Sequence, residues 1–248
     1  MPEGPQMVFL KEQASRFIGQ KVLQTKGNAK GIPFDEINNQ VLVDIRTFGK
    51  ELLFCFEPFA VRIHLMLFGK YAINDELNRE LRLGCEFEDG SINFYACECR
   101  FIREPLDEVY DWSVDVMNPA FDAATAATRL FAKPKALICE ALLDQNILAG
   151  VGNKIKNEVL FRQQVHPASV TGDIPQEILE KLVKECVRLS SEYLGWKRDG
   201  TDSDHWMVYQ RTECPRDHIP LLKEKIGKSS RSCYFCEKCQ KLYDHDAD

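Results

Sequence analysis

The stretch 148–153, Leu-Ala-Gly-Val-Gly-Asn, is followed by apolar residues that recur at helical spacing over 152–162. Gly150 and Gly152 let the backbone turn sharply where the helix begins. The first helical turn leaves N–H groups that can bind a phosphate. The pattern predicts a helix start that holds an anion, with Asn153 at its cap. An ordinary N-cap without a ligand is the alternative interpretation.

Two further helical patterns flank this stretch. Residues 135–143 predict a shorter helix before it, and residues 176–194 predict a long amphipathic helix after it. The earlier part of the chain differs, because a helix over 3–17 is followed by short runs that alternate between apolar and polar residues. Among them, Asp89-Gly90 between two apolar runs is a strong hairpin signal.

The change of pattern after Pro119 divides the chain. We predict an α+β multidomain protein, with an N-terminal helix plus β-sandwich followed by a helical domain and a Cys-rich end. The expected domains are residues 1–116, 117–210 and 211–248.

Composition narrows the class of protein. With 248 residues, 44% hydrophobic and 28% charged, the chain is an ordinary globular sequence. It has no run of about 20 apolar residues, so we expect no membrane contact. The start lacks a basic segment followed by an apolar core, so we expect a cytoplasmic protein, nucleoid-associated when on DNA, and a monomer.

Charge is distributed unevenly. The net charge of −6 argues against nucleic-acid binding when it is averaged over the chain. From Arg211 to Lys241, however, eight Lys and Arg stand against four Asp and Glu, an excess of four positive charges. This asymmetry fits a basic face on an acidic body, although a solvated surface gives the same pattern.

Cysteines gather at the same end of the chain. In a reducing compartment they favour metal ligation over disulfides. Cys236-x2-Cys239 has the spacing of half a zinc knuckle, and Cys214-x3-His218 is the candidate for the other half. Cys233 competes, because Cys233-x2-Cys236 has the same spacing, and an unmetallated thiol cluster is the alternative. We predict one structural Zn, held by Cys214, His218, Cys236 and Cys239. The other six cysteines read as core residues.

Seven short segments, spread in sequence order over nearly the whole chain, resemble motifs of the formamidopyrimidine-DNA glycosylase / endonuclease VIII family. The matching segments are 2–5 (Pro-Glu-Gly-Pro), 48–50 (Phe-Gly-Lys), 64–69 (His-Leu-Met-Leu-Phe-Gly), 142–153, 158–162, 208–211 and 231–240. The resemblance implies a helix-two-turns-helix in the helical domain and a C-terminal zinc ribbon. It also implies double-stranded DNA with a damaged base or abasic site as the partner.

The resemblance assigns the catalytic roles to Pro2, Glu3 and Lys50. Once Met1 is removed, Pro2 has a secondary α-amine, whose pKa near 8 leaves a neutral fraction that can attack a sugar carbon. Glu3 follows as the general acid on the sugar ring, and Lys50 reaches the damaged nucleotide. Without the resemblance, Pro2 and Glu3 would simply open a helix and Lys50 would be a turn lysine.

The resemblance also assigns the DNA contacts. Met66, Leu67 and Phe68 form an apolar run on an expected loop, where they can wedge into a base step and fill the gap left by a flipped nucleotide. Arg231 is expected on the phosphate beside the lesion, and Asn153 at the helix start that can hold a phosphate. A strand end in the core and a surface arginine are the plain alternatives.

Some positions depart from the family pattern. Gln6 stands where the family usually has glutamate, and a neutral amide cannot move a proton, which puts the lyase steps in doubt. Residues 195–207 are too short for the long loop of the formamidopyrimidine branch, which favours the endonuclease VIII branch and oxidised pyrimidines. We expect a bifunctional DNA glycosylase/AP lyase. A non-catalytic damage- or abasic-site-binding protein is the alternative, and a zinc-ribbon assembly module would leave Pro2, Glu3 and Lys50 unexplained.

Overall fold

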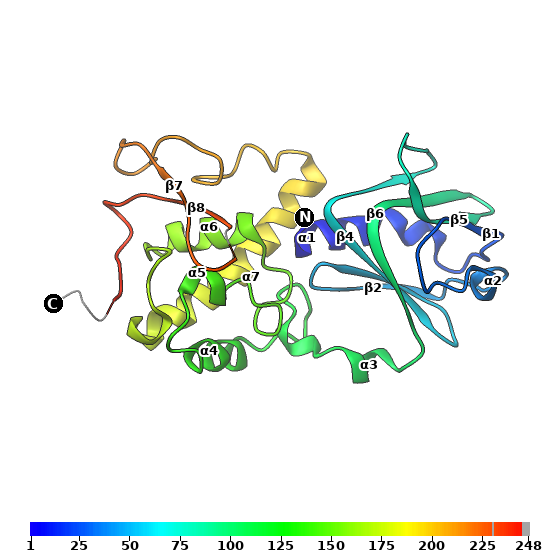
Figure 1. Ribbon diagram of the computed structural model, residues 1–248, viewed down its shortest axis with the longest axis horizontal. Coiled ribbons are helices and arrows are strands. Elements are labelled where there is room, and N and C mark those ends of the chain that lie inside the picture. The colour runs from blue at the N-terminus through cyan, green and yellow to red at the C-terminus, as the bar shows by residue number, and fades with distance from the viewer. Residues whose placement is uncertain (230, 245–248) are drawn as a thin grey trace. The chain divides into compact units, whose positions relative to one another are not determined.

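The computed structural model describes residues 1–229 and 231–244. The chain divides into two compact units, Met1–Trp112 and Ser113–Asp248 (Figure 1). The first boundary falls four residues before the predicted end of the first domain at 116. The second unit contains both the helices and the Cys-rich end, so the predicted separation at residue 210 stays a prediction.

The first unit is built on a six-stranded antiparallel sheet with strand order β1-β5-β6-β4-β3-β2. Its strands are β1 (Gln24–Lys26), β2 (Asp44–Phe48), β3 (Glu51–Cys55), β4 (Ala60–Ile73), β5 (Leu81–Phe87) and β6 (Gly90–Ile102).

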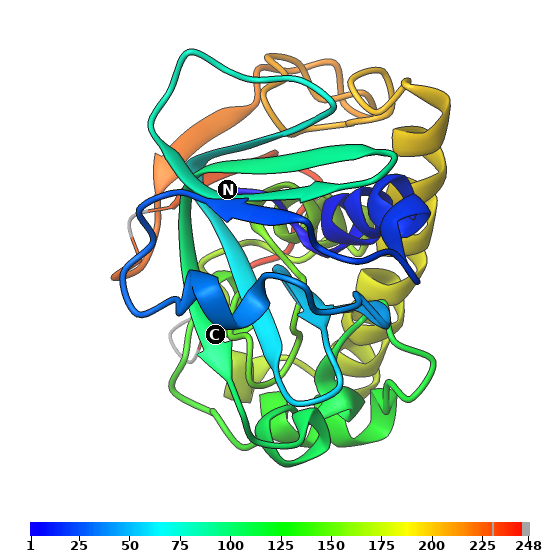
Figure 2. The same ribbon diagram turned by 90° about the vertical axis from the view of Figure 1, so that its right-hand side faces the viewer.

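The two long strands β4 and β6 run through both halves of this sheet (Figure 2). On one side of a register shift between Leu65 and Lys70, β4 pairs with β3 and with the end of β6. On the other side it pairs with the start of β6, which in turn pairs with β5. Side chains of the two halves meet in one apolar core, where the rings of Phe54 and Phe94 lie 5.8 Å apart. This is the predicted sandwich.

Helix α1 (Gly4–Ala14) buries Met7, Leu10 and Ala14 in that core and packs against β2 and β3. The predicted helix over 3–17 continues only as a 3-10 turn, Ser15–Phe17. The hairpin expected at Asp89-Gly90 is present, with Phe87 paired to Gly90, and a second hairpin pairs Phe48 with Glu51. Short helices α2 (Phe34–Ile37) and α3 (Leu106–Val109) and a 3-10 turn, Trp112–Val114, complete the region.

The second unit is helical. Its helices are α4 (Ala123–Phe131), α5 (Ile138–Ala141), α6 (Asn153–Arg162) and α7 (Gln176–Asp199), with a 3-10 turn at Thr171–Asp173. Apolar faces of these helices share one core. The helix predicted over 135–143 is shorter than expected. Helix α7 extends beyond the predicted residue 194 and ends at Gly200, whose φ of 72° suits the left-handed C-cap position.

A small hairpin of β7 (Leu222–Lys225) and β8 (Ser232–Phe235) lies against α6 (Figure 1). Strand alternation sends Cys233 and Phe235 into the helical core, whereas Tyr234 and Cys236 join a second cluster with Phe161 and Cys214. The expected fold class is therefore confirmed: a helix with a β-sandwich, a helical domain and a Cys-bearing ribbon.

Among the described residues, no helix is both long and apolar enough to span a membrane.

Candidate active site and nucleic-acid interface

The N-terminus lies beside strand β4. The terminal amine of Met1 donates to the carbonyl oxygen of Leu67 at 3.4 Å. The first unit therefore brings the predicted nucleophile segment next to the predicted wedge. Pro2 is half-buried, and Glu3 is only 3% exposed at the N-cap of α1.

Gln6 is engaged in this same helix start. Its Oε1 accepts a hydrogen bond from the backbone N–H of Glu3 at 3.1 Å. That bond satisfies one of the N–H groups that the first turn leaves without a helical partner. An amide serves this purpose as well as a carboxylate does, so the substitution at position 6 preserves the local geometry and removes only the charge.

Lys50 occupies the tip of the β2–β3 hairpin, directly after Gly49, whose φ of 53° lies in the left-handed region. The lysine is 7% exposed, so it is not the solvated turn residue of the plain interpretation. Its charge acts on His64, the strand partner of the adjacent Glu51. Burial first, and then the positive charges of Arg62 and Lys50, hold the pKa of His64 below its usual value.

The three apolar residues predicted as a wedge are exposed: Met66 at 46%, Leu67 at 56% and Phe68 at 72%. They lie inside strand β4 and not on the expected loop, but at the register shift where β4 leaves its pairing with β6. Hydrogen bonds to β6 hold β4 in the sheet on both sides of this shift. Where that pairing is interrupted, residues 66–68 can project from the sheet. Arg79 Nη1 supports it by donating to the carbonyl of Phe68 at 3.1 Å.

His64 connects the lysine to this apolar segment, and the sequence analysis did not assign it a role. Its Nδ1 lies 3.3 Å from the sulfur of Met66. On the same strand as His64, Arg62 Nε forms an ion pair at 2.7 Å with Oε1 of Glu51, which lies on the neighbouring strand β3. Because side chains alternate along a strand, Arg62, His64 and Met66 are expected on one face of β4. This spacing could have indicated His64 as a neighbour of the apolar segment.

In the second unit, the start of α6 and the ribbon meet at one carbonyl. The carbonyl oxygen of Ser232 accepts hydrogen bonds from Asn153 Nδ2 at 3.1 Å, Asn157 Nδ2 at 3.2 Å and Lys156 Nζ at 3.3 Å. Arg231, which is exposed, immediately precedes this residue. The structure therefore brings together Asn153 and the backbone that carries Arg231.

Asn153 differs in detail from the expectation. The N-cap of α6 is Gly152, and Asn153 is the first helical residue. Its Oδ1 is buried and has no hydrogen-bond partner among the residues that the structure describes. A buried acceptor without a partner costs free energy, which is typical of a side chain positioned for a ligand.

The four ligand atoms of Cys214, Asp217, Cys236 and Cys239 lie within 4.8 Å of one another. The sulfurs of Cys214 and Cys239 are 3.9 Å apart, close to the separation of about 3.8 Å that tetrahedral Zn–S bonds of about 2.3 Å impose. Three thiols and a carboxylate form a donor set that suits zinc. With four protein ligands the ion would have no open position, and its role would be structural.

The predicted ligand His218 is not in this group. Its ring is 76% exposed, and Nδ1 lies 3.2 Å from Glu213 Oε1. In its place, Asp217 Oδ2 lies 3.3 Å from the sulfur of Cys236 and 3.6 Å from that of Cys214. The backbone explains the exchange, because the N–H of Asp217 donates to Cys214 Sγ at 3.4 Å while His218 takes a left-handed φ of 55° and turns outward.

The competing ligand Cys233 points the other way. Lys156 Nζ lies 3.2 Å from its sulfur, on the α6 side of strand β8, and it is not a member of the four-residue cluster. Strand alternation thus separates Cys233 from Cys236, although their spacing alone allowed both to bind the same ion.

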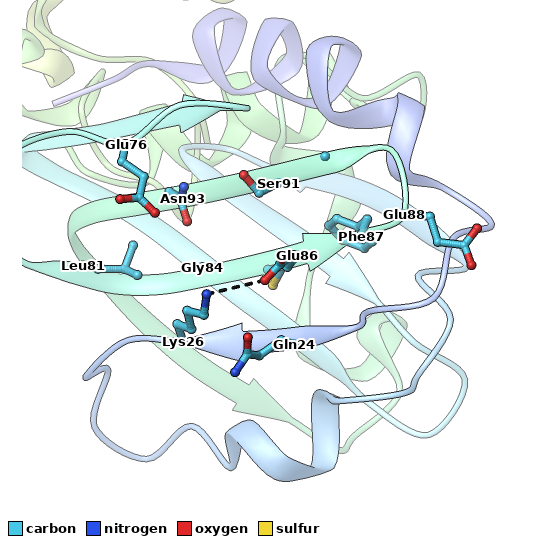
Figure 3. Close-up of a pocket in the computed structure, with 12 residues that line it drawn as sticks. Gln24, Lys26, Glu76, Leu81, Gly84, Glu86, Phe87, Glu88, Ser91 and Asn93 are labelled. Atoms are coloured by element: carbon cyan, nitrogen blue, oxygen red, sulfur yellow. Dashed lines mark hydrogen bonds and ion pairs between the residues drawn. The ribbon is translucent and has the colours of Figure 1, made fainter.

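A groove of about 330 Å³ opens elsewhere in the first unit, along β1, β5 and the start of β6 (Figure 3). Glu76, Glu86 and Glu88 line it, and its one cation, Lys26, is paired with Glu86 at 3.5 Å. Such an acidic lining repels phosphates, and none of the predicted site residues lies in it.

Known proteins resemble this chain in both sequence and fold. Residues 113–203 match the Formamidopyrimidine-DNA glycosylase H2TH domain. Endonuclease 8-like 3 from Mus musculus is 32% identical over 213 residues, which are 82% of this chain and 35% of that protein. Endonuclease 8-like 2 from Mus musculus is 25% identical and matches 97% of this chain and 96% of its own length.

The chain belongs to the formamidopyrimidine-DNA glycosylase / endonuclease VIII family. It spans only about a third of the mouse endonuclease 8-like 3. The fold matches a crystal structure of Lactococcus lactis formamidopyrimidine-DNA glycosylase bound noncovalently to DNA containing an AP site. That match has a TM-score of 0.86 and 21% identity, and it covers 96% of this chain and 99% of the other. The predicted family is therefore confirmed.

Proposed function

We propose that this protein is a bifunctional DNA glycosylase/AP lyase that uses the amine of Pro2 as its nucleophile. The observation that carries the proposal is the juxtaposition at strand β4, where the amine of Met1, the residue directly before Pro2, lies 3.4 Å from the carbonyl oxygen of Leu67 within the exposed apolar segment 66–68. A nucleophile beside an apolar wedge is what an enzyme needs when it acts on a base removed from the stack.

The chemistry begins when removal of Met1 frees the secondary amine. The nitrogen of Pro2 forms a bond to C1′ of the nucleotide as the glycosidic C1′–N bond breaks and the base leaves with a proton. The C1′–O4′ bond then breaks, O4′ takes up a proton and the open sugar carries an iminium at C1′. The iminium acidifies C2′, and loss of that proton eliminates the 3′ phosphate with breakage of the C3′–O bond. Glu3, nearly buried at the adjacent position, protonates the opening sugar ring.

The remaining proposed residues bind DNA. Lys50 contacts the damaged nucleotide, and Met66, Leu67 and Phe68 fill the gap in the duplex. In the second unit, Asn153 and Arg231 bind phosphates, with Ser232 holding the ribbon backbone against α6. We propose oxidised pyrimidines as the favoured lesions, which a panel of damaged duplexes would test.

A structural zinc completes the proposed ribbon. Cys214, Cys236 and Cys239 supply three ligands, and the fourth is Asp217 or His218. Metal-bound Cys and His give different charge-transfer spectra when cobalt replaces zinc. If Asp217→Asn shifts the cobalt spectrum and His218→Ala does not, the carboxylate is the ligand; the reverse result assigns the imidazole.

Borohydride trapping tests the nucleophile. Protein with a free Pro2 amine should form a covalent adduct with abasic or thymine-glycol duplex, because borohydride reduces the iminium. Pro2→Gly keeps a primary amine and should retain part of the adduct. A protein blocked at the N-terminus should form none while still binding the duplex.

Gln6 favours the second candidate, a binding protein that recognises damage without cutting. If the unblocked protein binds abasic duplex and yields no adduct, this second function replaces the first. A Gln6→Glu variant would then show whether the missing carboxylate is responsible.

A further inference from the structure

Two cysteines and a lysine form a buried cluster in the second unit, away from the proposed metal ligands. Cys139 on α5 is 2% exposed, and Cys233 on β8 and Lys156 on α6 are 0% exposed. Cys139 and Cys233 belong to the same buried apolar cluster, and a hydrogen bond between their thiols raises the pKa of Cys139 and lowers that of Cys233. Lys156 Nζ lies 3.2 Å from Cys233 Sγ and donates to the carbonyl of Ser232 at 3.3 Å.

A fully buried ammonium group requires a compensating negative charge. Among the described residues, no acidic group forms an ion pair with Lys156, whose Nζ contacts the Ser232 carbonyl and the Cys233 sulfur. Cys233 is therefore suited to carry that charge as a thiolate. In agreement, the hydrogen bond from Cys139 and the charge of Lys156 lower the pKa of the Cys233 thiol, whereas that of Cys139 is raised.

We propose that Cys139 and Cys233 are a peroxide-sensitive thiol pair that oxidation joins into a reversible disulfide between α5 and β8. The thiolate sulfur of Cys233 attacks a peroxide such as hydrogen peroxide, becomes a sulfenic acid and releases hydroxide. The sulfur of Cys139 then attacks the sulfenic sulfur. An S–S bond forms, and the hydroxyl group leaves as water with the proton of the Cys139 thiol.

The charge of Lys156 favours both the oxidation of the thiol pair and the later reduction of the disulfide. In the reduced protein, that charge favours the reactive thiolate. A disulfide removes that negative charge and leaves the buried ammonium with only the Ser232 carbonyl, so the oxidised state carries an electrostatic cost. The disulfide should consequently be easy to reduce, as expected of a regulatory bond and not of a structural one.

Peptide mapping of the full-length, zinc-loaded protein tests the proposal. The protein is exposed to graded hydrogen peroxide, free thiols are alkylated under denaturing conditions, and digested peptides are fragmented. We expect a linked pair containing Cys139 and Cys233, lighter by two hydrogen atoms and restored by dithiothreitol. In Cys139→Ser, the reaction should stop at the Cys233 sulfenic acid, which dimedone traps.

Two controls make the result specific. Cys186 is also fully buried in this unit, and burial raises the pKa of its thiol, so Cys186→Ser should oxidise as the wild type does. Lys156→Met should slow linkage at least about tenfold because the thiolate is lost. Lys156→Arg keeps the charge and should largely preserve the rate, which separates charge from folding.

Three results would overturn the proposal. One is oxidation of Cys186 as fast as that of Cys233 with no linked peptide. Another is an unchanged linkage rate in a folded Lys156→Met protein. The third is a product in which Lys156 and Cys233 are bridged through oxygen and Cys139 stays alkylated.

Discussion

The two compact units bury polar groups in different ways. In residues 1–112, the buried polar side chains are 3–8% exposed, and among them are Glu3 and Lys50 of the proposed active site. In the second unit, a complete stretch of α6 (Lys156, Asn157 and Glu158) is 0–1% exposed. Each of these three residues bonds to a segment more than 40 positions away in the sequence.

This difference separates two uses of a buried charge. Apolar packing of the sandwich core defines the first unit, and two of its few buried polar residues, Glu3 and Lys50, are those of the proposed active site. In the second unit, polar groups of α6 join the ribbon and the 206–211 segment to the helices. The comparison predicts that equivalent polar substitutions should reduce activity in the first unit and stability in the second.

Loss of the proposed metal should have the largest effect, and it should be confined to the second unit. Structural zinc contributes on the order of 10 kcal/mol to small metal-bound domains. Cys236→Ser should lower the bound zinc and increase hydrogen exchange in the ribbon and α6, with residues 1–112 unchanged.

The matched control for the metal is Cys233→Ser, which lies on strand β8 three residues before Cys236 but faces α6. It should keep the zinc, as measured by metal analysis of the purified protein. Equal loss of zinc from both variants would mean that Cys233 is a ligand and that the alternation of β8 does not separate the two thiols.

Glu3→Gln should give the next largest effect. The amide keeps the shape and an acceptor oxygen but cannot supply a proton, so we expect base excision to fall by about 10²- to 10⁴-fold. The thermal midpoint should change little, because the amide keeps an acceptor oxygen for the backbone N–H of the helix start. Excision from a thymine-glycol duplex and thermal melting are the two measurements.

If Glu3→Gln lowers the thermal midpoint as well as the excision rate, Glu3 acts through folding. The two units would then not differ in how they use their buried polar residues. Gln6→Ala serves as the control for the helix start, because it removes the 3.1 Å bond to the Glu3 N–H and leaves the carboxylate in place.

Glu158→Ala tests the opposite case. The carboxylate accepts backbone N–H bonds from Met207 at 3.0 Å, Val208 at 2.9 Å and Tyr209 at 2.8 Å. Its removal leaves three buried donors without partners, and we expect a loss of about 3 kcal/mol or more in the free energy of unfolding. Glu158→Gln keeps an acceptor oxygen and should lose less. Chemical denaturation of both variants measures the two losses. If Glu158→Ala is as stable as the wild type, Glu158 does not hold the 207–209 backbone against α6 as we infer.

Much of this organisation could be predicted from the sequence. The Asp-Gly pair between two apolar runs located the hairpin at Gly90, and helical spacing located α6 and α7. These local patterns determine local structure directly. The same reasoning took residues 66–68 for a loop, because a register shift between two long strands depends on pairing with distant residues.

The details of the candidate site were harder to predict for the same reason. Lys156, Asn157 and Glu158 are polar positions on a helix, but the ribbon covers the first two and the backbone of residues 207–209 covers the third. Nothing within α6 indicates that cover. The spacing of the C-terminal cysteines allowed Cys233 as well as Cys236, and only the side of β8 on which each lies distinguishes them. Likewise, the choice between Asp217 and His218 depends on one backbone φ angle.

The smallest expected effect is a pH dependence at the ribbon contact. The His166 ring lies 4.5 Å from that of Phe235 on β8, and its Nδ1 accepts the N–H of Ala168 at 3.2 Å. Burial lowers the pKa of His166 below its unfolded value. The unfolded chain therefore binds the proton more readily, and stability should fall as pH drops below about 6.5. His166→Asn keeps a local acceptor and does not titrate, so its unfolding free energy should decrease less between pH 7.5 and pH 5. Parallel loss in both proteins would place the acid sensitivity elsewhere, and would mean that the ribbon contact at β8 tolerates a charge that the first unit's apolar core would not.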